Sequence, residues 1–123
     1  MGESKDFKDL LAWKKGHEVM LFVYRETKQF PSHELFSLVN QMRRAAISVT
    51  SNIAEGFGRR TLPEKIRFYD IAIGSLYELQ SQIIAAKDLG YLSEQNYDEL
   101  ESETISAQKL LNGLISSLQK IQN

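Results

Sequence analysis

The sequence predicts an all-α protein: one domain over residues 1–123, folded as an up-down-up-down antiparallel four-helix bundle. Apolar residues recur at steps of three and four through four long segments, and this spacing marks one face of an α-helix. No alternating strand pattern and no internal repeat occur. The only two prolines are Pro31 and Pro63, and most of the seven glycines fall at or between the four segments. Because the connections are short, consecutive helices are expected to run antiparallel.

The first helix is predicted at about residues 9–28. Its apolar stripe consists of Leu10, Trp13, His17, Met20, Tyr24 and Thr27. Leu11, Val19, Phe22 and Val23 widen this stripe. An apolar face this broad indicates that the helix contacts two neighbours. Phe30-Pro31 ends the segment, since the residue before a proline avoids the α region.

The second helix is predicted at about residues 32–55. It carries a nearly regular a/d seam made by Leu35, Leu38, Val39, Met42, Ala45, Ala46, Val49 and Ile53. Ser32 is expected to cap its start, with Glu34 favourable in the first turn. Gly56 is predicted to be the residue just after the helix, where a glycine adopts positive φ at little cost.

The third helix is predicted at about residues 62–89, because Thr61-Leu62-Pro63-Glu64 reads as a capping box and Gly90 as a terminator. Gly74 interrupts its middle, at a cost of about 1 kcal/mol relative to alanine. We expect another backbone to approach closely there, either inside the bundle or across a contact between subunits.

The fourth helix is predicted at about residues 94–121, with Ser93 as its cap. Its heptad pattern continues through Tyr97, Leu100, Thr104, Ala107, Leu111, Leu114, Leu118 and Ile121. Ile105 and Ile115 lie off this seam, as scattered surface residues or as part of an oligomer face. Gly113 is expected to serve a role similar to that of Gly74.

Composition excludes several classes of function. The chain has no cysteine, which rules out disulfides, thiol catalysis and cysteine-ligated metals. A net charge of −1 argues against a protein that is basic as a whole and binds nucleic acid. The polar start, MGESKDFKDL, lacks the apolar region of a signal peptide, and no segment is long enough to span a bilayer. We therefore expect a cytoplasmic protein.

No set of catalytic or metal-binding residues emerges. His17 and His33 lie in different predicted helices, outside any metal-ligand spacing, and His17 is expected to pack in the core or an interface. The fourth helix begins with a run of acids that complements its dipole: Glu94, Asp98, Glu99, Glu101 and Glu103. The sequence thus indicates no enzyme, no metal, no cofactor and no small-molecule substrate.

One polar stripe lies beside the seam of the second helix. It contains Gln41, Arg44, Ser48, Asn52 and Glu55. The favoured interpretation is structural: Arg44 pairs with a carboxylate of another helix, while Asn52 and Glu55 hold the following loop. The alternative is a surface for a ligand or for RNA.

Basic residues gather near the loop between the second and third helices. They are Arg43, Arg44, Arg59, Arg60, Lys65 and Arg67, and Phe57 is available for stacking. This is the candidate nucleic-acid site. A plain solvated loop is an alternative, and so is a ring in which this basic region meets the acidic region of a neighbouring subunit.

Two strings carry a family resemblance. After Phe30-Pro31, QMRRAAISVTSNIAEGFGR and FYDIAIGSLYELQSQIIAAKDLGYL resemble the bacterial four-helix-bundle family encoded in intervening sequences of large-subunit ribosomal RNA genes. The resemblance covers about Leu10 to Leu118. The matched positions are Gln41, Arg43, Arg44, Ala45, Ser48, Asn52, Ile53, Ala54, Glu55 and Gly56, followed by Gly74, Ser75, Glu78 and Leu79.

The resemblance implies a homopentameric ring of bundles without an established cellular role. Its relatives include the accessory variability proteins of diversity-generating retroelements, which bind nucleic acid and a reverse transcriptase. This chain departs from the pattern at Gln80 and Ser81, where the family often has Glu-Thr, and it lacks the strong basic character of the retroelement relatives. We therefore expect a non-enzymatic homo-oligomeric interaction protein, with an RNA- or DNA-binding accessory protein as the alternative.

Overall fold

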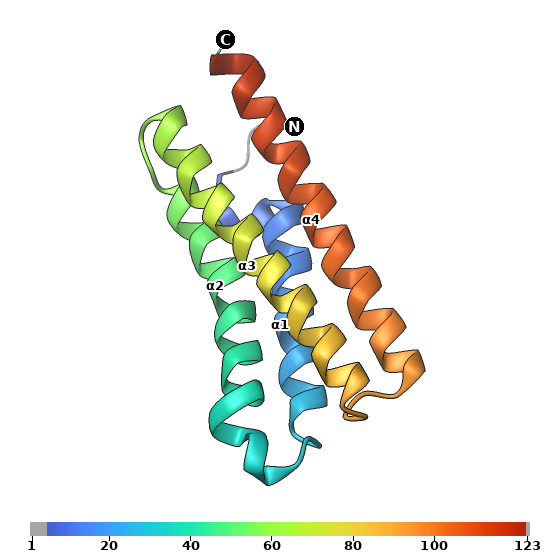
Figure 1. The fold of residues 1–123 in the computed structure, drawn as a ribbon. Helices are drawn as coiled ribbons and strands as arrows, with labels where there is room; N and C mark the ends of the chain where they lie inside the picture. The colour runs from blue at the N-terminus through green and yellow to red at the C-terminus, as the bar shows by residue number, and fades with distance from the viewer. Residues whose placement is uncertain (1–4, 123) are drawn as a thin grey trace.

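The computed structural model describes residues 5–122, and the helices within this range form a four-helix bundle (Figure 1). Helix α1 spans Leu11–Thr27, α2 spans Asn40–Phe57, α3 spans Leu62–Asp88 and α4 spans Glu94–Gln122. Each helix packs against the next in the chain, and α4 returns to pack against α1. No strand occurs in the described residues. The predicted all-α four-helix bundle is confirmed, while the predicted domain and its polar start include residues 1–4, which lie outside the described range.

Contacts between helices show that neighbours run antiparallel. On α2 and α3, Ser48 contacts Ser75, whereas Gly56, later in α2, packs against Tyr69, earlier in α3. None of the helices in residues 5–122 combines the length and apolarity needed to cross a bilayer.

The entry into α2 differs from the predicted continuous helix over 32–55. Ser32–Glu34 form a 3-10 turn and Leu35–Val39 a π-helical turn before α2 begins at Asn40. Ser32 does not cap a helix, because Pro31 is the residue preceding the 3-10 turn and no side-chain cap forms. The extra residue of the π turn changes which side chains face inward, and it leaves Phe36 89% exposed.

Gly56 also corrects the prediction, because it lies inside α2 rather than after it. Its φ is not positive. A Cβ atom at this position would lie 2.7 Å from Cε1 of Tyr69 and 3.1 Å from the backbone oxygen of Lys65. Glycine is therefore required here by the packing of α3 on α2 and not by a turn.

The predicted caps of α3 and α4 are confirmed. Thr61 Oγ1 accepts a hydrogen bond from the Glu64 N–H at 3.3 Å, and Ser93 Oγ accepts one from the Asn96 N–H at 3.1 Å. Gly90 ends α3 with a φ of 82°. These signals are local, so they hold whatever the neighbouring helices do.

The core is built largely from the predicted apolar stripes, although Leu11, Leu35 and Ile121 of those stripes are exposed. Its largest fully buried side chains are Met42, Ile53, Leu76, Leu79, Ile83, Leu100, Leu111, Val19, Val23 and Val49. Ile115 joins this core at 7% exposure, so its assignment to the surface was wrong. It lies one turn beyond Leu111, and a helix packed against two neighbours buries a face wider than a strict a/d seam.

The glycines of α3 and α4 do not serve close packing inside the bundle. A Cβ added at Gly74 or at Gly113 would have no neighbouring atom within 4 Å. Gly16 is, with Gly56, at a close helix contact, since a Cβ added to it would lie 3.2 Å from Cγ1 of Val49 and 3.3 Å from Cγ2 of Thr50. Close packing within the described bundle therefore does not explain Gly74, and a contact between subunits stays a prediction.

Two tyrosines make stability sensitive to alkaline pH. Burial raises the pKa of Tyr69 to about 12, and the hydrogen bond that the Tyr97 hydroxyl donates to Glu101 at 2.6 Å raises the pKa of Tyr97 to about 12. The ordinary value is 10.0. The native state thus keeps protons that the unfolded chain loses, so this stabilisation is complete below about pH 10 and disappears toward about pH 12.

We expect Tyr97→Phe to make the alkaline fall in the free energy of unfolding shallower, because phenylalanine has no proton to lose. Urea unfolding in a series of buffers from about pH 9 to about pH 12 measures this dependence. Glu101→Gln, which removes the carboxylate that accepts the Tyr97 hydrogen bond, should make the slope shallower in the same way. Equal slopes for all three proteins would contradict the role assigned to Tyr97.

Candidate interaction surfaces

The polar stripe of α2 lies beside α3 and borders a surface groove. This α2–α3 groove has a volume of about 760 Å³. Its lining residues are Phe36, Asn40, Gln41, Arg44, Ala45, Ser48 and Glu78. The groove brings together Gln41, Arg44, Ser48 and Glu78, which belong to the two strings that carry the family resemblance.

A hydrogen bond on the groove's inner side ties α2 to α3. The Ser48 and Ser75 hydroxyls lie 2.8 Å apart. Asn52 Nδ2 donates to the backbone oxygen of Ser48 at 2.8 Å and to its Oγ at 3.0 Å. Only the Ser48–Ser75 contact crosses between helices. Both Asn52 bonds stay within α2, so Asn52 does not hold the following loop as expected.

Arg44 does not make the ion pair expected of it. Its side chain is exposed, and among the described residues no carboxylate lies within ion-pair distance. Glu78 lines the same groove as Arg44, but its carboxylate does not come within ion-pair distance of the Arg44 guanidinium. Glu55 does contact the following loop, as the structural interpretation expects, because it pairs with Arg59 at 2.6 Å. The stripe is therefore structural at Ser48 and Asn52 and open to a partner at Arg44.

The predicted basic patch divides into two groups. Arg43 lies toward the other end of the bundle, beside the last residue of α1, where its Nε donates to Thr27 Oγ1 at 2.9 Å and its guanidinium lies 4.8 Å from the Tyr24 ring centre. It faces α1, away from the loop. At 1.5 Å per residue, the path along α2 from Arg43 to Phe57 is about 20 Å. The prediction of a single patch of six cations was wrong for Arg43, because a helix separates residues along its axis that stand in one short stretch of sequence.

The loop group contains Arg59, Arg60, Lys65 and Arg67. The guanidinium carbons of Arg59 and Arg67 lie 4.5 Å and 4.6 Å from the centre of the Phe68 ring. Lys65 Nζ donates to the backbone oxygen of Phe57 at 2.6 Å. The aromatic residue predicted for this site was Phe57, whereas the structure adds Phe68. The signal for Phe68 is that it directly follows Arg67 in the sequence.

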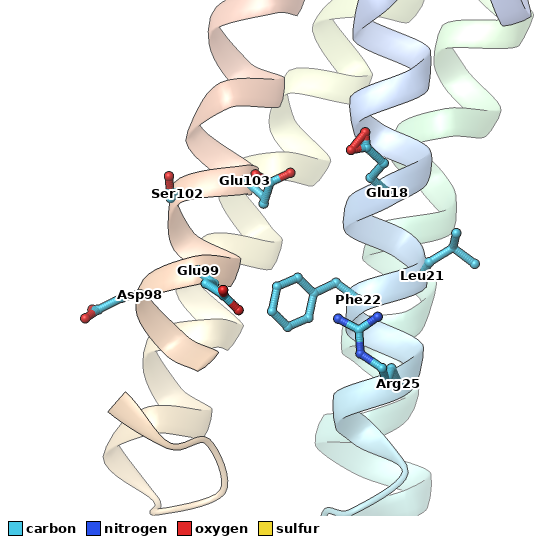
Figure 2. Close-up of a pocket in the computed structure, with 8 residues that line it drawn as sticks. All are labelled: Glu18, Leu21, Phe22, Arg25, Asp98, Glu99, Ser102 and Glu103. Atoms are coloured by element: carbon cyan, nitrogen blue, oxygen red, sulfur yellow. The ribbon is translucent and has the colours of Figure 1, made fainter. Parts of the chain in front are cut away.

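A second groove runs between α1 and α4 and is acidic (Figure 2). This α1–α4 groove has a volume of about 570 Å³. It is lined by Glu18, Leu21, Phe22, Arg25, Asp98, Glu99, Ser102 and Glu103. Figure 2 shows the Phe22 ring extending from α1 toward α4. Four carboxylates thus surround an apolar floor that has one cation, Arg25, in the lining.

Lys15 neutralises one end of this groove. Its Nζ lies 2.8 Å from Glu103 Oε2 and 3.4 Å from Glu18 Oε1. The hydrogen bond to Glu103 is the main reason why the pKa of Lys15 is raised. Asp98 and Glu99, at the other end, make no ion pair with another described residue. From the sequence, the acids of α4 were expected only to complement the helix dipole. The groove was not predicted, because half of the residues that line it belong to α1.

The two histidines lie apart. His17 stacks on Trp13, with ring centres 4.9 Å apart and an interplanar angle of 12°. His33 is exposed, and its Nε2 lies 3.8 Å from Glu34 Oε2. Over residues 5–122, no group of three or more side chains is arranged to hold a metal ion.

Comparison with known proteins matches the chain to a family and to solved structures. The model of a family described as "23S rRNA-intervening sequence protein" matches residues 8–113. A crystal structure of a protein of unknown function from the S23 ribosomal protein family, from Bacteroides thetaiotaomicron VPI-5482, superposes with a TM-score of 0.79. It is 20% identical, and the alignment covers 89% of this chain and 98% of that one, which shows a common fold. No curated protein matches the chain.

Proposed function

The chain belongs to the family of 23S rRNA-intervening sequence proteins, and from this premise we propose that it is a non-enzymatic interaction protein that works as a homo-oligomer. The family resemblance implies a pentamer. Neither comparison indicates a catalytic family. A cytoplasmic location is part of the proposal.

An outward-facing stripe on α3 carries the proposal. Ile71, Gly74, Tyr77 and Ile84 recur at helical spacing, and all four are exposed. Exposed apolar side chains mark interfaces when they gather on one face. Gly74 costs about 1 kcal/mol of helix stability relative to alanine, and in residues 5–122 no atom outside its own turn of helix lies within 4 Å of a Cβ placed there. The backbone of a neighbouring subunit at this stripe would compensate for that cost.

Light scattering coupled to size-exclusion chromatography tests the oligomer. At micromolar concentration we expect a mass five times that of the 14.1 kDa chain. A single species with the mass of one chain would refute the proposal.

A second function, nucleic-acid binding at the loop group, is favoured by one specific contact. Arg59 and Arg67 both lie against the Phe68 ring, while Arg60 is exposed beside them. Guanidinium groups held on an aromatic ring present planar cations that stack on bases and bind phosphates. Ion pairs of Arg59 with Glu55 and of Arg67 with Glu64 offset part of this charge.

For this second function we expect Arg59→Ala/Arg60→Ala to weaken the binding of a labelled single-stranded RNA, measured by fluorescence anisotropy at several salt concentrations. Two lost phosphate contacts would reduce the slope of log affinity against log salt by about 1.4 for a single strand. Arg25→Ala, an exposed cation on α1, is the matched control. Absence of binding by the unmodified protein at low salt would remove this function from consideration.

A further inference from the structure

The α1–α4 groove keeps an excess of negative charge after its own ion pairs are formed. Its lining contains four carboxylates and a single cation, Arg25. Lys15 neutralises the end of the groove that contains Glu103, at 2.8 Å. Asp98 and Glu99, toward the other end, are exposed and make no ion pair with another described residue. A cation that enters the groove is therefore attracted to the α4 side of that end.

The groove also has an apolar surface. The Phe22 ring extends from α1 toward α4 and forms the floor (Figure 2). Leu21, on the α1 side of the lining, is 51% exposed. Apolar groups that lie among charged ones are typical of a surface that binds another protein, because a small hydrated ion gains nothing from them. The occupant must therefore carry apolar side chains as well as cations.

Arg25 shows which cation the groove accommodates. Its guanidinium carbon lies 4.7 Å from the centre of the Phe22 ring. A guanidinium group is planar and more weakly hydrated than an ammonium group, so it stacks on an aromatic ring and pairs with a carboxylate through two parallel hydrogen bonds. Arg25 belongs to the α1 side of the groove, whereas the carboxylates of Asp98 and Glu99 on the α4 side have no such partner. Further arginine side chains fit this chemistry better than lysine side chains do.

Two contacts between α1 and α4 flank the groove and set its length. Lys15 pairs with Glu103 at one end. At the other end, Asn96 Nδ2 donates to Glu26 Oε1 at 2.8 Å. Residues 15–26 of α1 extend over about 16 Å, which a helix of about three turns covers when it packs between the ridges of α1 and α4. An extended segment would find no strand edge among the described residues with which to pair its backbone.

We propose that the α1–α4 groove is the docking site for an arginine-rich amphipathic helix of a partner protein. The apolar side chains of this helix lie on Phe22 and beside Leu21, and arginines one turn apart pair with Asp98 and Glu99. One chain supplies every residue of the lining, so the site is independent of the proposed oligomer.

A second copy of this chain does not offer such a helix. Among residues 5–122, no helix presents two arginines one turn apart. Arg43 and Arg44 of α2 are adjacent and lie on different surfaces, and Arg43 is bonded to Thr27. Nucleic acid is repelled, because its phosphates would meet carboxylates. The partner of this groove is therefore a different, cationic protein.

Fluorescence anisotropy with a labelled peptide tests this docking site. The probe is an alanine-based helical peptide of about fifteen residues, with leucines on one stripe and arginines on the adjacent one. We expect it to bind the unmodified protein at low salt, and Asp98→Asn/Glu99→Gln to weaken binding by about tenfold through the loss of two ion pairs. A peptide with lysine in place of every arginine should bind more weakly. Both substituted positions are exposed, so circular dichroism should show an intact bundle.

Asp88→Asn/Glu94→Gln is the matched control, since it removes the same charge from two exposed acids outside the lining, and it should bind the peptide like the unmodified protein. Equal weakening by both double variants would mean that net charge alone attracts the peptide, which overturns the site. Equal binding of a peptide with the same composition in scrambled order overturns it too, as does absence of binding to the unmodified protein at low salt. A lysine peptide that binds as tightly overturns the assignment to arginine.

Light scattering on the same samples separates this site from the proposed oligomer. A peptide that dissociates the oligomer as it binds assigns the groove to a contact between subunits and overturns the partner helix. A monomeric protein that binds the peptide, and binds it more weakly as Asp98→Asn/Glu99→Gln, supports the docking site and refutes only the oligomer.

Discussion

Leu76→Ala is expected to lower the free energy of unfolding by about 2–5 kcal/mol. Leu76 lies in the middle of α3 and is 0% exposed. Truncation removes its apolar contacts and leaves a cavity that the surrounding helices fill only in part, since protein interiors are close-packed. Urea unfolding followed by circular dichroism measures the change, at one fixed protein concentration because assembly adds to apparent stability.

Leu89→Ala is the control for this substitution. Leu89 follows the same helix and is 57% exposed. Its truncation should change the free energy of unfolding by no more than about 0.5 kcal/mol. Equal effects at the two positions would mean that α3 does not turn the face containing Leu76 toward the core.

Gly56→Ala is expected to destabilise the protein by about 1–3 kcal/mol, although alanine is the better helix former. The added methyl group would lie 2.7 Å and 2.9 Å from two carbons of the Tyr69 ring and 3.1 Å from the Lys65 backbone oxygen. Tyr69 is buried and Lys65 contributes a backbone atom, so neither moves cheaply. The same unfolding experiment measures this change.

Gly113→Ala is the same substitution at an open position, and we expect it to stabilise the protein instead. It lies in α4, in a helical conformation, with no atom within 4 Å of the added methyl group. The substitution should raise the free energy of unfolding by up to about 1 kcal/mol. A loss of stability there would show that another subunit packs against Gly113. A gain at Gly56 would contradict the close approach of α3.

Much of the fold was predictable because helix formation depends on nearby residues. The apolar steps through Leu100 and Leu111 place one face of α4 in the core, and Thr61 and Ser93 begin their helices by bonding to an N–H three residues away. The entry to α2 was not predictable in the same way. The residues of the π turn at Leu35–Val39 are as apolar as those of an α-helix, so the sequence does not distinguish the two. The π turn differs in the direction in which each side chain points.

The candidate surfaces were predictable only where one helix supplies them. The stripe containing Arg44 and Ser48 is visible as a spacing within α2, and so it was found. The α1–α4 groove joins Phe22 to Glu99, which are far apart in the chain. Residues adjacent in the sequence can also lie on different surfaces. Arg43 contacts α1, whereas Arg44 lines the α2–α3 groove.

The sequence by itself determined the all-α class, the four helices and the caps of α3 and α4, since these depend on side chains within about one turn of each other. Only the tertiary structure decided what each glycine is for and which charges meet. Gly56 reads in the sequence as a helix end and Gly74 as a close contact, yet the Tyr69 ring lies against Gly56, and no neighbour in the described residues lies within 4 Å of a Cβ at Gly74. That difference is a property of the neighbouring helix, which no local pattern contains.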